Sequence, residues 1–148
     1  MADVVGSALA VEQEIRIEAP RERVFALLTE EGEMARWLPQ PRFESRIGGR
    51  FGMQTGEWSA VGEVVALDPP RRVAYTWDWE NAPLGARTEV SFDLEEDGAA
   101  TIVRLRHTGF ASEEQAASHD EGWRYYGERL AMAGAGGDPG PDRHMDAS

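Results

Sequence analysis

The sequence contains no cysteine and no long apolar run. The absence of cysteine excludes disulfides, thiolate metal sites and a cysteine nucleophile, and it fits a reducing compartment, so we expect a cytoplasmic protein. No apolar run approaches the length of a membrane span, so no spanning helix is expected. The first ten residues lack the basic start of a signal peptide, and we expect no secretion signal.

Basic residues are few relative to acidic ones. The 15 Lys and Arg residues stand against 27 Asp and Glu residues, which gives a formal net charge of -12 and a pI near 4.6. A chain of this charge is repelled by phosphate backbones, so nucleic acid is not an expected partner. The acidic surplus is typical of a soluble surface.

Motifs for metals, phosphates and serine nucleophiles are missing. The three histidines form no His-Glu-x-x-His motif, and one of them, His144, lies close to the C-terminus, so no metal site is expected. The segment Gly48-Gly49-Arg50 is not continued by the Gly-Lys-Ser/Thr of a phosphate loop, and no Gly-x-Ser-x-Gly elbow occurs. We therefore expect no cofactor.

The length of 148 residues favours one domain. Residues 1–10 are interpreted as a flexible N-terminal tail. Residues 134–148 are rich in Gly, Pro and Asp without an apolar period, which is typical of a disordered C-terminal tail. The single domain is thus predicted to span residues 11–133.

One long amphipathic helix is predicted from Ser112 to Met132, and the rest of the chain is organised around it. His119, Trp123, Tyr126 and Leu130 recur at helical spacing and share one face. Ser112 is a suitable N-cap, with Gln115 three residues later. The inward face is aromatic and polar-tipped, where an ordinary core helix carries Leu and Val.

Alternating apolar and polar residues predict a mostly antiparallel sheet. Gly48-Gly49 and Asp97-Gly98 are hairpin signals, and residues 56–60, with Trp58, are interpreted as a turn. Two short helices follow the first strand. The strands are predicted at residues 11–18, 42–47, 50–55, 61–67, 71–79, 87–94 and 101–107, and the short helices at 21–29 and 33–38. Segregated strands and helices indicate the α+β class, with the sheet wrapped around the last helix.

Three stretches resemble the START-like, or SRPBCC, superfamily and its helix-grip fold. They are Ile17 to Leu38 (IEAPRERVFALLTEEGEMARWL), Gly62 to Trp79 (GEVVALDPPRRVAYTWDW) and His107 to Leu130, with a His-x-x-Gly-Trp centre at His119. Within the superfamily the chain is similar to the family named after the activator of the heat-shock protein 90 ATPase. The resemblance implies a deep cavity between the curved sheet and the last helix.

Inward-facing aromatic residues either line such a cavity or fill a core. Aromatic walls with a few polar tips suit a small hydrophobic ligand, and five tryptophans in a small domain favour the cavity. The candidate ligand-binding residues are Trp37, Phe51, Met53, Trp58, Tyr75, Trp77, Trp79, Phe92, Leu105, His107, His119, Trp123 and Tyr126.

Three functions follow from this pattern. The first is binding of a lipid-, flavonoid- or polyketide-like molecule. The second is a cyclase, aromatase, dehydratase or hydrolase, in which His107, His119 and Tyr75 supply acid–base groups; alternatively, each histidine is a core or rim residue satisfied by one hydrogen bond.

The third is a co-chaperone-like interaction domain, as the family name suggests. The characterised co-chaperones of this family pair the domain with an N-terminal one, for which 148 residues leave no room. Residues 42–55 are also predicted to include an exposed edge strand through which a homodimer would pair.

Overall fold

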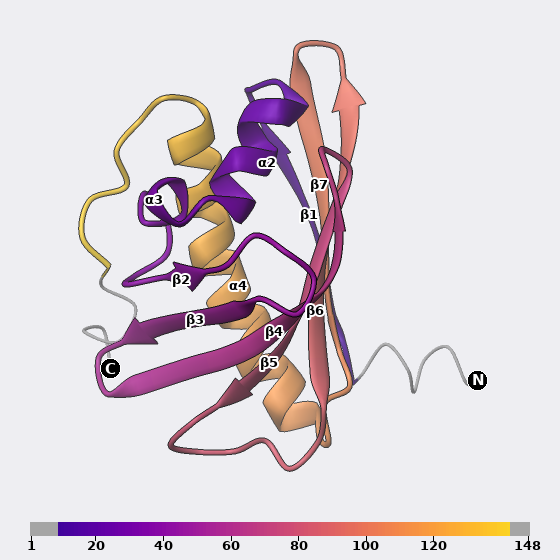
Figure 1. The fold of residues 1–148 in the computed structure, drawn as a ribbon, viewed down its shortest axis with the longest axis vertical. Coiled ribbons are helices and arrows are strands. Elements are labelled where there is room, and N and C mark those ends of the chain that lie inside the picture. The colour runs from indigo at the N-terminus through magenta and orange to yellow at the C-terminus, as the bar shows by residue number, and fades with distance from the viewer. Residues whose placement is uncertain (1–8, 143–148) are drawn as a thin grey trace.

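A computed structural model describes residues 9–142 of the chain (Figure 1). The elements follow one another as β1 (Val11–Ile17), α2 (Arg21–Thr29), α3 (Glu31–Met34), β2 (Arg42–Phe43), β3 (Arg50–Thr55), β4 (Trp58–Asp68), β5 (Arg72–Trp79), β6 (Thr88–Asp97), β7 (Ala100–Thr108) and α4 (Glu113–Gly134). The predicted N-terminal tail lies outside the described residues except for Leu9 and Ala10, which lead into β1.

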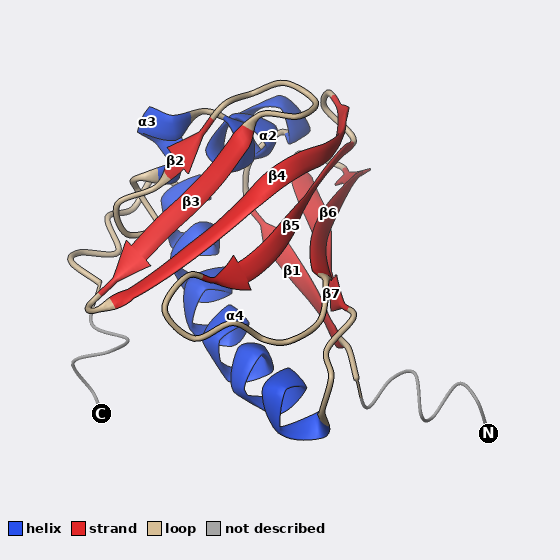
Figure 2. Cartoon of the chain, turned by 60° about the horizontal axis from the view of Figure 1, so that its bottom comes forward, coloured by secondary structure: helices blue, strands red, loops and turns tan. Residues whose placement is uncertain are grey.

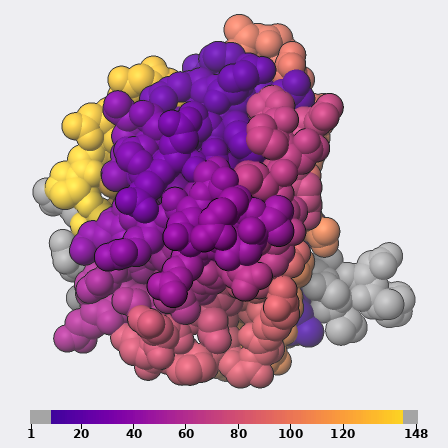
Figure 3. Space-filling model, in the orientation of Figure 1, coloured from indigo at the N-terminus to yellow at the C-terminus, as the bar shows by residue number. Residues whose placement is uncertain are grey.

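The seven strands form one antiparallel sheet in the order β1-β7-β6-β5-β4-β3-β2. The sheet curves around α4, and α2 and α3 cover one end of the helix (Figure 2). In the space-filling view the indigo to magenta residues of α2, α3 and strands β2 to β4 make one continuous surface (Figure 3). The helix-grip fold expected from the sequence is confirmed.

Local sequence explains where α4 begins and which face it buries. The Ser112 hydroxyl accepts a hydrogen bond from the Gln115 backbone N–H at 3.2 Å, as expected of an N-cap. Trp123, Tyr126 and Leu130 are buried on the inner face. The helix continues two residues beyond the predicted end, to Gly134, and Gly136 then takes a positive φ of 91°.

The loops around β3 differ from the prediction. Strand β2 has only two residues, and the backbone of Gly48 and Gly49 bonds to Val64 of β4 instead of closing a two-residue hairpin. Trp58 is not in a turn, because the turn is completed by Gly56, with φ 58°, and Glu57. Trp58 therefore opens β4 and pairs with Thr55 across a tight hairpin.

The segment after α4 packs against the domain as far as Asp142. The buried Arg129 guanidinium donates hydrogen bonds to the carbonyls of residues 139–141 and to the carbonyl of Trp37. Residues 135–142 are thus not the disordered tail that their composition predicts, because a buried cation holds their backbone. Residues 143–148, with His144, lie outside the described residues.

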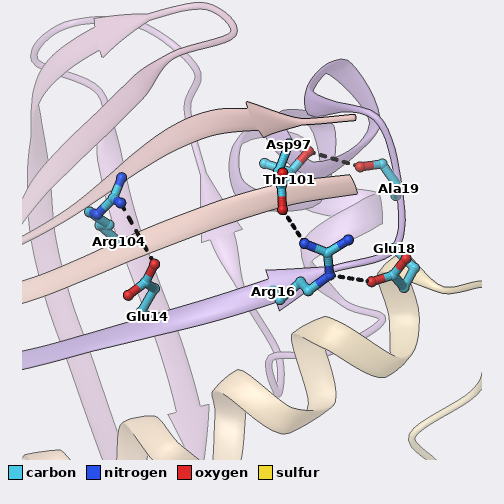
Figure 4. A network of polar contacts seen from close by, with 7 residues as sticks. All are labelled: Glu14, Arg16, Glu18, Ala19, Asp97, Thr101 and Arg104. Atoms are coloured by element: carbon cyan, nitrogen blue, oxygen red, sulfur yellow. Dashed lines mark hydrogen bonds and ion pairs between the residues drawn. The ribbon is translucent and has the colours of Figure 1, made fainter. Parts of the chain in front are cut away.

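Polar contacts join the ends of β1, β6 and β7 (Figure 4). The buried Thr101 hydroxyl donates to the Ala19 carbonyl at 2.8 Å, and exposed Arg16 pairs with Glu18 and Asp97. Exposed pairs contribute about 1 kcal/mol or less each, so the buried hydroxyl is the stronger constraint. These contacts tie the edge strand β1 and the residues after it to β6 and β7.

No helix within residues 9–142 is both long and apolar enough to cross a membrane.

Candidate functional site

A cavity of about 300 Å³ lies between α4 and the half of the sheet that contains β3, β4 and β5. Its mouth is formed by exposed residues, among them Trp58, Ala82 and Ser118. Strands β3 to β5, the loop after β5 and residues 118–126 of α4 contribute the walls. The lining residues are Met53, Thr55, Trp58, Trp77, Trp79, Ala82, Ser118, His119, Gly122, Trp123 and Tyr126.

Many of the residues expected to contact a ligand meet in this cavity. They come from β3, β4, β5 and α4, which lie far apart in the sequence. These residues are Met53, Trp58, Trp77, Trp79, His119, Trp123 and Tyr126. Four of the five tryptophans therefore share one cavity.

The other expected residues lie in the packed core and do not line this cavity. They are Trp37, Phe51, Tyr75, Phe92, Leu105 and His107, all buried.

Two of these core residues illustrate the difference. Tyr75 stacks on Phe51 with ring centroids 4.1 Å apart, and the Trp37 indole donates to the Leu27 carbonyl at 2.7 Å. Both rings are enclosed by neighbouring side chains.

The prediction missed four lining residues, Thr55, Ala82, Ser118 and Gly122. Ser118 and Gly122 precede Tyr126 by two turns and one turn of α4, so helical spacing carries the signal. Their small side chains leave the space that bulky residues would fill. Thr55 continues the inward alternation of Met53, whereas Ala82 lies in a loop without any periodic signal.

His107 is enclosed in a complete hydrogen-bond chain beside the cavity. The Trp123 indole N–H donates to His107 Nδ1 at 3.0 Å, and His107 Nε2 donates to the Thr88 hydroxyl at 2.9 Å. The Thr88 hydroxyl donates in turn to the Trp77 carbonyl. Burial, with a smaller effect of His119, lowers the pKa of His107 to about 2. The ring is therefore neutral and its lone pair is occupied.

His119 lines the cavity and is also hydrogen-bonded at both nitrogens. Its Nδ1 donates to the Gln115 carbonyl at 2.7 Å, and its Nε2 accepts from the Trp79 indole at 2.9 Å. Burial lowers the pKa of His119 as well, so the ring is held neutral. The two histidines thus fix the orientation of two indoles, and neither has an unoccupied lone pair with which to take a proton from a ligand.

Trp77 is the centre of the aromatic wall. Its ring centroid lies 5.5 Å from that of Trp79 at 87°, and 5.3 Å from that of Trp123 at 57°. Trp58 meets Trp79 at 79° over 6.3 Å. The Trp77 indole nitrogen is buried and has no hydrogen-bond partner among residues 9–142. Steep angles between neighbouring rings give adjacent walls rather than one stacked layer.

The end of the cavity next to the C-terminal segment is polar. The Thr55 and Tyr126 hydroxyls both donate to the same Asp142 carboxylate oxygen, at 2.8 and 3.1 Å. This carboxylate joins β3 to α4, both of which line the cavity. Burial raises the pKa of Tyr126, so its hydroxyl stays protonated at neutral pH.

Within residues 9–142 there is no group of three or more His, Asp or Glu side chains placed to hold a metal ion.

Comparison with known families places the chain clearly. Residues 18–134 match the family described as Activator of Hsp90 ATPase homolog 1-like protein. This span begins at the end of β1 and stops at the end of α4, so it includes all but one of the elements that form the cavity domain. No curated protein sequence matches the chain.

Solved structures share the fold. The solution structure of CalU16 from Micromonospora echinospora aligns with a TM-score of 0.78 and 29% identity, over 94% of this chain and 72% of that one. The crystal structure of MLL2253 from Mesorhizobium loti aligns with a TM-score of 0.73 and 26% identity, over 82% of this chain and 93% of that one. The solution structure of the Aha1 dimer from Colwellia psychrerythraea aligns with a TM-score of 0.72 and 22% identity, over 85% of this chain and 96% of that one.

Proposed function

The chain belongs to the family of Activator of Hsp90 ATPase homolog 1-like proteins, and from this premise we propose that it binds a small hydrophobic or aromatic molecule between α4 and strands β3 to β5. The family assignment made from the sequence is confirmed. The gathering of four indoles around one cavity is the observation that carries the proposal. Apolar, concave sites with a few polar groups are the usual binding sites for small molecules.

The volume of the cavity limits the size of the ligand. About 300 Å³ is at the lower end of the range for ligand pockets. A molecule of one or two rings fits this space better than a long fatty acid. Ser118, Thr55 and Tyr126 offer hydroxyl groups for orienting such a molecule.

Binding is better supported than catalysis on the same cavity. Of the three acid–base candidates, Tyr75 and His107 are core residues. His119 reaches the cavity, but the Trp79 indole occupies its acceptor nitrogen. A general base needs an accessible lone pair near the proton that it removes.

The test combines fluorescence with mass spectrometry. The protein is titrated with one- and two-ring aromatic compounds, flavonoids and fatty acids while tryptophan emission is followed, and each mixture is then analysed for new product masses. We expect saturable quenching by the small aromatic compounds and unchanged ligand masses. A new mass that disappears in His119→Ala would favour the enzyme instead.

A matched pair of variants locates the binding. Ser118→Phe places a ring in the mouth of the cavity, whereas Ala117→Phe adds the same ring at an exposed neighbouring position that does not line it. Affinity should fall at least about tenfold in the first variant and stay within about twofold in the second. Equal affinities in both variants, or no quenching by any compound, would contradict the proposal and favour a role on the outer surface, such as a co-chaperone contact.

Two expectations from the sequence stay predictions. Homodimerisation through residues 42–55 is tested by light scattering, and β2 is now known to cover only part of β3 at this edge. The cytoplasmic location is tested by cell fractionation.

A further inference from the structure

The four tryptophans of the cavity, Trp58, Trp77, Trp79 and Trp123, are here called the indole cage. The ring of Trp79 contacts two other rings of the cage at steep interplanar angles, 79° with Trp58 and 87° with Trp77. The indole N–H groups of Trp79 and Trp123 are tied to histidines, so these two rings are fixed before any ligand arrives. The cage is thus a rigid set of walls formed by electron-rich rings.

Charged side chains are absent from the lining residues. His119 is the one titratable base among them, and it is neutral because burial lowers its pKa. An anionic ligand would find no cation to pair with and would lose its hydration on entry. The formal net charge of -12 adds a long-range repulsion for anions and an attraction for cations.

We infer that the occupant of the cavity is an organic cation whose trialkylammonium head is held by the indole cage. This inference rests on the proposed function and specifies the class of ligand. The face of an indole carries negative charge density, and tryptophan is the best of the aromatic residues for binding a cation. A trialkylammonium group is large and weakly hydrated, so apolar walls remove little hydration that must be replaced.

The rest of the cavity suits the remainder of such a molecule. Tyr126 and Thr55 supply hydroxyl groups at the end next to Asp142. Met53 and the small residue Gly122 also line the cavity, and neither adds a polar side chain. A ligand with a cationic head and a short aromatic or polar tail would use both ends.

Three probes of nearly equal shape separate charge from size. Phenyltrimethylammonium, tert-butylbenzene and benzenesulfonate each carry a tetrahedral head on a phenyl ring, with positive, zero and negative charge. Binding to the full-length protein is measured by tryptophan fluorescence and by calorimetry. We expect the cation to bind at least about tenfold more tightly than the neutral probe, and the anion to bind more weakly than both.

Trp58 provides the variant test, because it is 37% exposed at the mouth and its replacement leaves the core intact. Trp58→Leu keeps an apolar wall and removes one ring face. It should therefore lower the affinity for the cation about fivefold and the affinity for the neutral probe less than about twofold. Trp58→Phe should restore part of the cation affinity.

The outcomes separate the two proposals. Equal or tighter binding of tert-butylbenzene would overturn the cation inference and leave the proposed hydrophobic site standing. Preferential binding of the cation with no difference between Trp58→Leu and the unchanged protein would place the cation outside the cage and also overturn the inference. If none of the three probes binds, the cation inference fails, and the broader compound panel decides the proposed function separately.

Discussion

Acidification should destabilise the protein because His107 is buried as a neutral ring. Its Nδ1 accepts the Trp123 indole hydrogen, and burial lowers its pKa to about 2. In the unfolded chain the same side chain has an ordinary pKa of about 6.5. Between these two values the unfolded state binds one more proton than the folded state, so the free energy of unfolding falls as pH falls below about 6.5.

The magnitude follows from proton linkage. Each pH unit below about 6.5 lowers the free energy of unfolding by about 1.4 kcal/mol per neutral buried histidine. Between pH 7 and pH 5, His107 alone should therefore cost about 2 kcal/mol. Burial also lowers the pKa of His119, which adds to the loss in the same direction. Most carboxylates remain ionised down to about pH 5, so the histidines dominate this range.

Urea unfolding followed by tryptophan fluorescence, at half-unit steps from pH 7.5 to 5, measures this dependence. The control is His107→Gln, which replaces the ring by a side chain that does not titrate. Whatever its overall stability, this variant should lose about 2 kcal/mol less than the unchanged protein between pH 7 and pH 5. Parallel curves for the two proteins would refute a neutral, buried His107.

Two stability predictions use matched variants in urea unfolding. Trp123→Phe should cost about 2 kcal/mol more than Trp77→Phe, because the first leaves a buried histidine acceptor unpaired and the second removes an indole N–H that has no partner; equal losses would contradict this. Gly62→Ala should cost more than about 3 kcal/mol, since its Cβ would lie 1.8 Å from a carbonyl oxygen of β5. Gly32→Ala, with open space around the new Cβ, should be neutral or stabilising, and a similar loss in both glycine variants would count against the close approach of β4 and β5.

Periodicity was enough to predict the α+β class and an antiparallel sheet around α4, because the residues that face inward repeat in a simple way along each strand and along α4. The helix-grip fold itself was implied by the resemblance to the START-like superfamily. Tyr75, Trp77 and Trp79 do share the concave face, as alternation predicts. Alternation predicts only which side of the sheet a residue faces, however, and not which residues of other elements pack against it. Tyr75 stacks on Phe51 and is enclosed, whereas Trp79 lines the cavity.

The cavity itself depends on where bulk is missing, which is a property of opposing elements. Gly122 and Ser118 on α4 are small and leave this space open. The positions of the aromatic residues alone could not reveal it. The C-terminal segment could not be predicted for a similar reason. Its composition indicates disorder, but Arg129 on α4 supplies hydrogen bonds to backbone carbonyls that local sequence does not foresee.

Nuclear magnetic resonance of the five indole N–H groups tests the central claim most directly. Each tryptophan gives one indole signal, which single Trp→Phe variants assign. A ligand bound in the cavity should shift the signals of Trp58, Trp77, Trp79 and Trp123, which line it, and leave Trp37 unchanged, since that indole is buried against Leu27. Saturable binding that leaves the four signals in place, or that shifts Trp37 instead, would contradict a ligand site between α4 and the sheet.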